Sequence, residues 1–286
     1  CKSYKMFYNI AISGGGINTL AFIGCLKYLE EENKSIHALT NYLGASGGSI
    51  MCLFMILGFT SEEIKIFLTN EIPKINTFSI WSVFRFFKQF GLNDGENIYK
   101  LINNILEYKK VNTKITFLEL AKLTGKNLII SVTNVSQQKI EYLSVDNYPF
   151  MQIRTAIRMS TSIPLFFTPV RFYDDIYVDS MVFNNFPINF FNNFNNETLG
   201  LNIISTSDRK KIKTFSDYIS FLGDCINQTY YKHTKTSHKY VCNIILNEAI
   251  KNINYKTLRF DFSNHKMNEL ILLGYTTLRI FFNETQ

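Results

Sequence analysis

Three short segments of this chain carry residues whose types and spacing suit acyl-transfer chemistry. Gly14 to Gly16 can present backbone N–H donors, and Ser46 lies within the small-residue run Gly44 to Gly48. Much later, Asp179 follows an apolar run and supplies a carboxylate. A serine nucleophile, a carboxylate base and backbone donors for an oxyanion are together the parts of a serine acyl hydrolase.

The serine pentapeptide fits a nucleophile elbow, which is a sharp turn between a strand and a helix. Small residues flank the serine of such a turn because neighbouring backbone segments approach closely there. Gly44 and Gly48 meet this requirement, and Ser46 lies between an expected strand at 38–43 and an apolar helix. A glycine-rich surface turn also produces this pentapeptide. Ser49 lacks a following glycine and is expected inside the helix.

The first glycine-rich turn also follows a strand and opens a helix, as nucleotide-binding turns do. The dinucleotide fingerprint needs a third glycine where this chain has Thr19, and no Gly-Lys-Ser/Thr follows as a P-loop requires. As an oxyanion hole the turn works well, because glycine amides at a helix N-terminus face a negative charge without an intervening side chain. We therefore expect an oxyanion hole at Gly14, Gly15 and Gly16, with the Gly15 and Gly16 amides as direct donors.

Asp179 is better placed for a base than the neighbouring aspartates. Asp174 and Asp175 are expected in a hairpin turn and Asp146 in a polar loop. Asp179 instead ends an apolar strand that leads to the carboxyl edge of the sheet, where such folds place their sites.

A Ser-His-Asp triad would also need a histidine, and none of the four in the chain has a supporting local motif. His37 precedes the second expected strand, and His233, His238 and His265 lie in polar stretches. A triad that uses one of the last three stays open as an alternative to a Ser-Asp pair.

Expected strands and helices alternate along the chain, which predicts an α/β fold with a mostly parallel sheet covered on both faces. Capping boxes at Thr60 to Glu63 and Thr116 to Glu119 mark two helix starts. A hairpin over 170–178 is expected to turn at Asp174-Asp175. Other strands are expected at residues 6–13, 38–43, 128–133, 139–143, 199–205 and 257–262, and further helices at 18–32, 151–159, 215–231 and 266–282.

The composition is that of a globular protein with excess positive charge. Of 286 residues, 46% are hydrophobic, and the net charge is +7. Basic residues are scattered apart from the run Arg209 to Lys213, and without a nucleic-acid-binding pattern we expect no nucleic-acid partner. Five cysteines without a CxxC pair or a Cys/His cluster indicate a reducing, cytoplasmic location and no structural metal. No apolar run reaches the roughly 18 to 20 residues of a spanning helix.

Several motifs in one order resemble those of patatin-like phospholipases, over about residues 6–206. Gly14 to Gly16 resemble that family's oxyanion turn, and Gly44 to Gly48 resemble its nucleophile elbow. Asp179 resembles its catalytic aspartate, ahead of the matching Asn185-Phe186-Pro187. Two further segments resemble the family's sequence just before the aspartate, namely Ala156 to Pro164 and Phe167 to Val170.

The resemblance implies a three-layer α/β sandwich related to the α/β hydrolases and a Ser46–Asp179 dyad without histidine. It implies hydrolysis of fatty acyl esters in phospholipids or other lipids, of the phospholipase A or lysophospholipase type. No cofactor and no metal are expected. The implied partner is an acyl lipid, and the protein is expected in the cytoplasm or bound peripherally at a membrane surface.

Two places depart from the family's usual pattern. Asn18 and Thr19 stand where a basic residue and a glycine are usual, and Ser180-Met181 replace a glycine pair or Gly-Ala after the aspartate. These changes can crowd the nucleophile or alter the oxyanion turn. A scaffold that binds a lipid or a protein without turnover is therefore the alternative to an active hydrolase.

We expect one domain over residues 1–286, with a core at about 6–206, a helical cap inserted at about 69–110 and a C-terminal extension at about 207–286. Aromatic and basic residues alternate in the expected cap. They either pack the cap onto the core or enter a lipid headgroup region. These residues are Trp81, Phe84, Arg85, Phe86, Phe87, Lys88 and Phe90.

Overall fold

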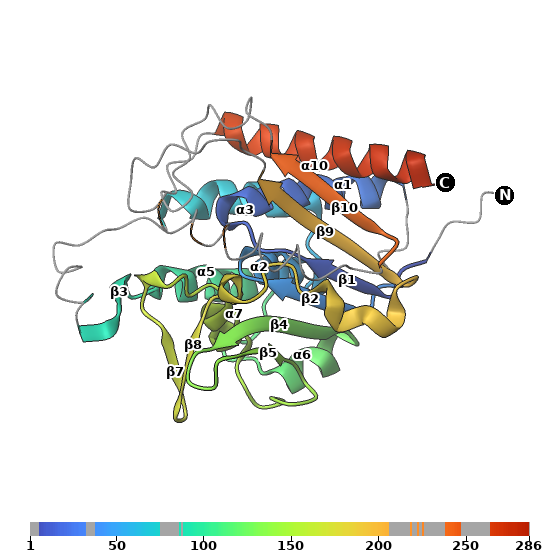
Figure 1. Ribbon diagram of the computed structural model, residues 1–286. Coiled ribbons are helices and arrows are strands. Elements are labelled where there is room, and N and C mark those ends of the chain that lie inside the picture. Colours follow the sequence, from blue (N-terminus) through green and yellow to red (C-terminus); the bar gives the residue numbers. More distant parts are fainter. Residues whose placement is uncertain are drawn as a thin grey trace.

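A twisted, mostly parallel sheet runs through the protein and carries helices on its faces, as the alternating pattern predicts (Figure 1). The computed structural model describes residues 6–32, 38–74, 86, 88–205, 218, 222, 225, 238–246 and 264–285. Strands in the described part are β1 (Asn9–Ile12), β2 (Asn41–Ala45), β3 (Gly91–Asn93), β4 (Asn127–Asn134), β5 (Lys139–Leu143), β6 (Leu165–Phe167), β7 (Val170–Phe172), β8 (Asp175–Val178), β9 (Thr198–Ser205) and β10 (Val241–Leu246).

The α-helices follow the expected order, and short 3₁₀ helices occur beside them. The α-helices are α1 (Ala21–Glu31), α2 (Gly47–Ile56), α3 (Ser61–Glu71), α5 (Glu96–Tyr108), α6 (Phe117–Thr124), α7 (Ile153–Ser160) and α10 (Asn264–Thr285). The 3₁₀ helices are η1 (Gly16–Leu20), η3 (Ile72–Lys74), η4 (Ser180–Val182) and η5 (Ile188–Phe194).

The strand order in the main sheet is β10-β9-β1-β2-β4-β8-β7, and β5 also pairs with β4. The five strands from β10 to β4 are parallel, whereas β5 and β8 run antiparallel to β4, and β7 runs antiparallel to β8. A separate parallel pair joins β3 to β6. The central strands are almost continuously buried, as expected for parallel strands covered on both faces.

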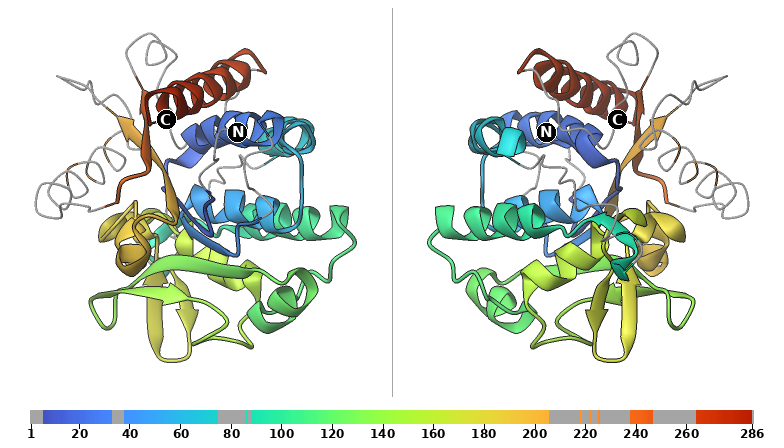
Figure 2. Two further views of the ribbon diagram at one scale, coloured as in Figure 1. Left: turned by 90° about the vertical axis from the view of Figure 1, so that its right-hand side faces the viewer. Right: turned by 90° about the vertical axis from the view of Figure 1, so that its left-hand side faces the viewer.

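The two faces of the sheet have cores of different size. The large core lies between the sheet and α1, α2, α3, α5 and α10, on one side of the sheet in Figure 2. On the other face η5 packs against the sheet and forms a small core. Its buried residues are Ala11, Leu43, Ile129, Phe186, Ile188 and Phe191.

Both expected capping boxes are present. The Thr60 and Thr116 side chains each accept a hydrogen bond from the backbone N–H three residues on. In turn, the backbone N–H of each threonine donates to the carboxylate of Glu63 or Glu119. These reciprocal bonds satisfy N–H groups that have no partner within the helix, so α3 and α6 begin where the sequence predicts.

Several elements differ from expectation. The expected helix at 215–231 falls almost entirely outside the described residues, and the expected strand at 257–262 falls wholly outside them. Strand β10 at Val241–Leu246 was not predicted, and it extends the sheet beyond β9. The hairpin turn lies at Tyr173-Asp174, because Asp175 begins β8 and its carboxylate accepts a hydrogen bond from the Asn134 side chain.

The expected cap region contributes to the main core. The buried face of α5 carries Ile98, Leu101, Ile102, Ile105 and Leu106, all of which belong to the large core. Of the aromatic residues expected either to pack the cap or to enter a lipid headgroup region, Trp81, Phe84 and Phe87 lie outside the described residues, whereas Phe86 and Phe90 lie inside them.

Helices α1 and α10 pack in close backbone contact, side by side in Figures 1 and 2. A Cβ on Gly24 would collide with the Ile271 carbonyl, and one on Gly274 would collide with the Ala21 carbonyl. The Cys25 thiol also donates to the Gly274 carbonyl oxygen at 3.4 Å. The C-terminal helix is thereby fastened to the helix that follows the first glycine-rich turn.

We expect Gly274→Val to destabilise the fold, because its side chain would be forced into the backbone of α1. Overpacking of this kind costs about 1–3 kcal/mol of unfolding free energy. Denaturant unfolding of the variant measures the loss. The matched control is Leu272→Val, since Leu272 is 65% exposed on the same helix and should change stability by less than about 0.5 kcal/mol. Equal effects of the two substitutions would contradict this packing.

Candidate active site

Ser46 occupies a strained turn between β2 and α2. Its backbone has φ 48° and ψ −127°, a positive-φ conformation that costs a non-glycine residue energy and recurs at functional sites. A Cβ on Gly44 would collide with the backbone of Ser49, and one on Gly48 would lie 2.5 Å from the carbonyl oxygens of Ile12 and Ser13. The small residues around Ser46 are therefore required by backbone contact, as predicted for a nucleophile elbow.

A buried serine on α7 holds this turn in place. The Ser160 hydroxyl accepts a hydrogen bond from the Ser46 N–H at 2.9 Å and donates to the Ser131 carbonyl oxygen at 2.7 Å. Ser160 thus bridges the end of the elbow to β4. The segment Ala156 to Pro164 includes this serine, but the sequence gives it no role, because only the fold brings α7 beneath the elbow.

The Asp179 carboxylate lies directly against the Ser46 side chain. The Ser46 Oγ donates to Asp179 Oδ2 at 2.7 Å, and the Met181 N–H donates to Oδ1 at 2.8 Å. Asp179 is fully buried, and this burial raises its pKa from 3.8 to about 7, although the two hydrogen bonds oppose the shift. The site therefore holds a carboxyl group that titrates near neutral pH beside a serine hydroxyl.

Asp179 reaches Ser46 by a different route from the one expected. Strand β8 runs antiparallel to β4 and pairs only with its last two residues, Thr133 and Asn134. The chain therefore leaves β8 toward the level of Ser131, which is paired with Ala45 of β2. This register places the residue after β8 beside the residue after β2.

A buried arginine fastens the segment that supports Asp179. The Asp179 N–H donates to the Ser162 carbonyl oxygen at 2.9 Å, and the Ser162 hydroxyl contacts the Arg158 guanidinium. Arg158 also donates to the carbonyl oxygens of Asp94 and Thr168, each at 2.9 Å. One side chain thereby ties the loop after α7 to the loops before α5 and after β6.

The described histidines lie elsewhere. His238 Nε2 is 3.2 Å from the Asn192 side-chain oxygen, and His265 pairs with Glu269 on α10. His37 and His233 lie outside the described residues. The competing serine, Ser49, is inside α2 and donates to the Ser46 carbonyl oxygen, as expected for a helical residue.

The first glycine-rich turn lies next to the elbow, and its three glycines differ in their contacts. The Gly14 N–H donates to the Asn185 carbonyl oxygen at 2.9 Å, so this amide is engaged within the fold. Gly15 is the N-cap of η1, and Gly16 has φ 53°. Gly16 begins the first turn, where N–H groups have no partner within the helix.

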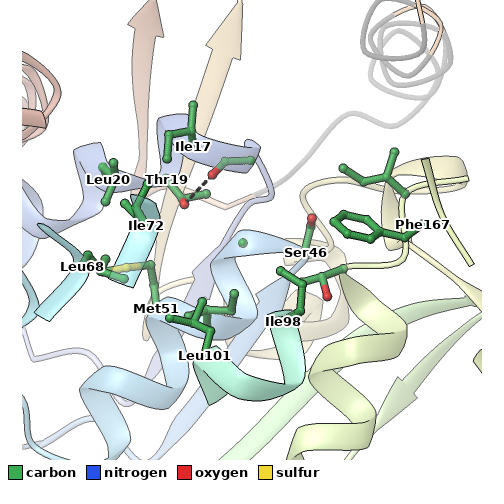
Figure 3. Close-up of a pocket in the computed structure, with 15 residues that line it drawn as sticks. Ile17, Thr19, Leu20, Ser46, Met51, Leu68, Ile72, Ile98, Leu101 and Phe167 are labelled. Atoms are coloured by element: carbon green, nitrogen blue, oxygen red, sulfur yellow. Dashed lines mark hydrogen bonds between the residues drawn. The ribbon is translucent and has the colours of Figure 1, made fainter. Parts of the chain in front are cut away.

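An apolar pocket opens beside Ser46, between η1, α2, α3 and α5 (Figure 3). Its volume is about 100 Å³. Apart from Ser46, Thr19 and Thr161, the lining side chains are apolar. They are Ile17, Leu20, Ile50, Met51, Leu68, Ile72, Ile98, Leu101, Ile163 and Phe167, with Gly16 and Gly47 contributing backbone.

A family model described as patatin-like phospholipase matches residues 10–191. This chain belongs to the patatin-like phospholipase family. The matched region contains the first glycine-rich turn, the elbow and Asp179. The patatin-like fold expected from the sequence is thereby confirmed, together with its mostly parallel central sheet.

Two viral proteins are similar in sequence to this patatin-like chain. "Probable lipid hydrolase 463L" of Invertebrate iridescent virus 6 is 31% identical over 186 residues, which cover 64% of this chain and 63% of that protein. The match therefore spans less than two thirds of that relative's length. "Uncharacterized protein R571" of Acanthamoeba polyphaga mimivirus is 29% identical over 265 residues, with 88% of each chain covered.

Two solved structures share the fold of this patatin-like chain. VipD from Legionella pneumophila superposes with a TM-score of 0.58 at 13% identity, over 97% of this chain and 67% of VipD. The type III effector protein ExoU superposes with a TM-score of 0.56 at 14% identity, over 97% of this chain and 53% of ExoU.

One departure from the usual patatin-like pattern is accommodated by a hydrogen bond. The Thr19 hydroxyl donates to the Gly16 carbonyl oxygen at 2.7 Å and lies in the pocket wall (Figure 3). A Cβ on Gly47 would lie 2.9 Å from the Thr19 methyl carbon, so this threonine fits only against a glycine. The Thr19 hydrogen bond therefore stabilises the first glycine-rich turn, and Thr19 fits beside it without a clash.

The described residues contain neither a metal-binding cluster nor a membrane-spanning helix. No group of three or more His, Cys, Asp or Glu side chains is arranged to hold a metal ion in the described part of the chain. Within the same residues, no helix has both the length and the apolar character needed to cross a bilayer.

We expect Ser160→Ala to destabilise the elbow, because the buried Ser46 N–H would lose its acceptor. An unsatisfied buried donor costs about 1–3 kcal/mol of unfolding free energy. The control is Ser131→Ala, because the Ser131 hydroxyl is also buried but has no hydrogen-bond partner in the described structure. Denaturant unfolding should show a loss for Ser160→Ala alone. A larger loss for Ser131→Ala would refute the bridging role.

We expect Asp179→Asn to stabilise the fold increasingly as the pH rises from about 4 to 7. The pKa of the folded carboxyl, about 7, lies above its ordinary value of 3.8, so the folded parent binds more protons than the unfolded parent between these pH values. The parent's unfolding free energy therefore decreases as the pH rises and remains low above 7. The neutral amide introduced by the substitution cannot titrate, so the variant lacks this loss.

Melting temperatures measured from pH 4 to pH 8 test this expectation. The difference between Asp179→Asn and the parent should grow in favour of the variant across this range. Asp146→Asn is the control, since it removes one carboxylate at an exposed position. A flat difference for Asp179→Asn would mean that Asp179 does not titrate near neutral pH.

Proposed function

We propose that this chain is a lipid acyl hydrolase of the phospholipase A or lysophospholipase type, with Ser46 as nucleophile and Asp179 as its base. The observation that carries the proposal is the 2.7 Å hydrogen bond from Ser46 Oγ to the buried Asp179 carboxylate, at the wall of an apolar pocket. A nucleophile within hydrogen-bond reach of a base is the arrangement that covalent acyl transfer needs.

In the proposed reaction, Asp179 accepts the Ser46 proton while Oγ attacks the ester carbonyl carbon. The N–H groups of Gly15 and Gly16 stabilise the oxyanion of the tetrahedral intermediate. Asp179 then protonates the departing alcohol, which leaves an acyl-serine. A water molecule, deprotonated by Asp179, attacks this acyl group and releases the fatty acid, so that Ser46 regains its proton.

The buried position of Asp179 suits this role. A general base works best when its pKa lies near the operating pH, and burial raises the pKa of Asp179 to about 7. An exposed aspartate would be ionised at neutral pH but would be a much weaker base. A histidine between the two groups is unnecessary, because carboxylate and hydroxyl are already in direct contact.

An acyl chain is the substrate part that fits the pocket. The pocket of about 100 Å³ is apolar, and cavities of about 150 Å³ in other proteins bind a molecule as large as benzene. A short length of acyl chain would therefore be accommodated next to the ester. The family membership and the similarity to the viral protein named as a probable lipid hydrolase support the same class of substrate.

Reaction with a fluorophosphonate probe, followed by intact mass, tests the nucleophile and its base. We expect one label on the parent and on Ser49→Ala, none on Ser46→Ala, and labelling of Asp179→Asn slowed by at least about 10²-fold, the lower range for a lost general base. The labelling rate of the parent should rise with pH through about 7, because the deprotonated form of Asp179 is the base.

Release of fatty acid from phosphatidylcholine and lysophosphatidylcholine vesicles, with the same variants, then tests the substrate class. Turnover by the parent that is abolished in Ser46→Ala would support the hydrolase. A folded parent that is neither labelled nor active on these lipids would instead favour a binding scaffold without turnover.

A further inference from the structure

We propose that Asn185 is a positioning residue that orients the peptide between Gly14 and Gly15 so that its N–H faces away from Asn185 and is available to the oxyanion. This inference rests on the proposed function for its chemical consequence. Its structural part, that Asn185 determines the orientation of this peptide, can be tested without any activity.

Asn185 binds both polar groups of Gly14. Its backbone carbonyl oxygen accepts the Gly14 N–H at 2.9 Å, and its side-chain Nδ2 donates to the Gly14 carbonyl oxygen at 3.2 Å. The Ser13 hydroxyl also donates to that carbonyl oxygen at 3.0 Å and in turn accepts the Ile203 N–H. The Gly14 carbonyl is therefore held from one side by two side-chain donors.

The planarity of the peptide bond transmits this orientation to the next amide. In a trans peptide the carbonyl and the N–H that share one plane point in opposite directions. Because the Gly14 carbonyl points toward Asn185 and Ser13, the Gly15 N–H points to the opposite side. Rotation of the plane would turn the donor away and present a carbonyl oxygen, which repels an oxyanion.

The oriented peptide is adjacent to the proposed nucleophile. A Cβ on Gly14 would lie 3.0 Å from Ser46 Cβ and would also collide with the Asn185 side chain. The space beside the Gly14 Cα is thus occupied by the Asn185 side chain and by Ser46 Cβ, with no room for a side chain. The glycine is needed because the asparagine and the elbow both pack against its Cα.

The segment that carries Asn185 is itself held rigidly. The Asn184 side chain accepts the Phe186 N–H at 3.0 Å, and Pro187 is the N-cap of η5. Phe186 and Ile188 are buried in the small core against the sheet. In the Asn185-Phe186-Pro187 motif, the buried phenylalanine therefore fixes the segment against the sheet, and the asparagine contacts the first glycine-rich turn.

The test compares Asn185→Leu with the parent and with Asn193→Ala, a change at an exposed asparagine of η5. Leucine keeps the branched shape and removes the donor. On a short-chain p-nitrophenyl ester, kcat of Asn185→Leu should fall by about 10- to 100-fold with KM within about threefold, because an oxyanion donor acts in the transition state. Asn193→Ala should match the parent in kcat and KM.

A thionoester of the same acid shows whether Asn185 acts through an oxyanion donor or only through the general structure of the site. Its sulfur is a weak hydrogen-bond acceptor, so oxyanion donors contribute little to its transition state. The ratio of kcat on the ester to kcat on the thionoester should therefore fall at least about tenfold in Asn185→Leu, as loss of one donor costs about 10²-fold or more. An equal fall on both substrates, or no fall on either, would overturn the catalytic part.

Crystal structures of the parent and Asn185→Leu test the orientation directly. We expect the Gly14 carbonyl to leave its present direction in the variant, and retention of that direction would overturn the proposal. If the parent is inert on both esters and unlabelled by fluorophosphonate, while the peptide rotates in Asn185→Leu, the proposed function fails and the orienting role of Asn185 stands.

Discussion

Backbone contact at the carboxyl ends of β1 and β2 is the constraint on which the rest of the structure depends. A Cβ on Gly48 would lie 2.5 Å from the carbonyl oxygens of Ile12 and Ser13, and one on Gly14 would lie 3.0 Å from Ser46 Cβ, so the turns after β1 and β2 are in contact. Within the second turn, a Cβ on Gly44 would collide with the backbone of Ser49, and Ser46 has a positive φ of 48° and lines a pocket. Hydrogen bonds from neighbouring elements, chiefly through Ser160 and Asn185, hold the two turns in that arrangement.

The buried Asp179 links stability to the proposed chemistry. Removing a carboxylate from water is unfavourable, and two hydrogen bonds compensate only in part, so the pKa of Asp179 rises to about 7. A site of this kind is less stable than one with a neutral side chain, yet its basicity follows from the same burial. Arg158 and Ser162 contribute by fixing the loop that supports the Asp179 backbone.

The sequence predicted an element well where the interaction that defines the element joins residues close together in the chain. The capping boxes at Thr60 and Thr116 are present because they need only four consecutive residues. Strand β10 was missed, since its pairing with β9 depends on residues about 40 positions away in sequence. The hairpin turn was placed one residue late, because the contact of Asp175 with Asn134 is also a tertiary one.

The sequence by itself determined the chemical groups: glycines where no Cβ fits, a serine between them, and an aspartate at the end of a strand. These follow from residue type and short spacing, which a sequence displays directly. Only the tertiary structure decided how the groups meet. The antiparallel course of β8 places Asp179 at Ser46, and the Asn185 contacts engage the Gly14 amide, leaving Gly15 and Gly16 as the proposed oxyanion donors. Such contacts join residues 133 and 171 positions apart, and their geometry depends on strand register, which no local pattern encodes.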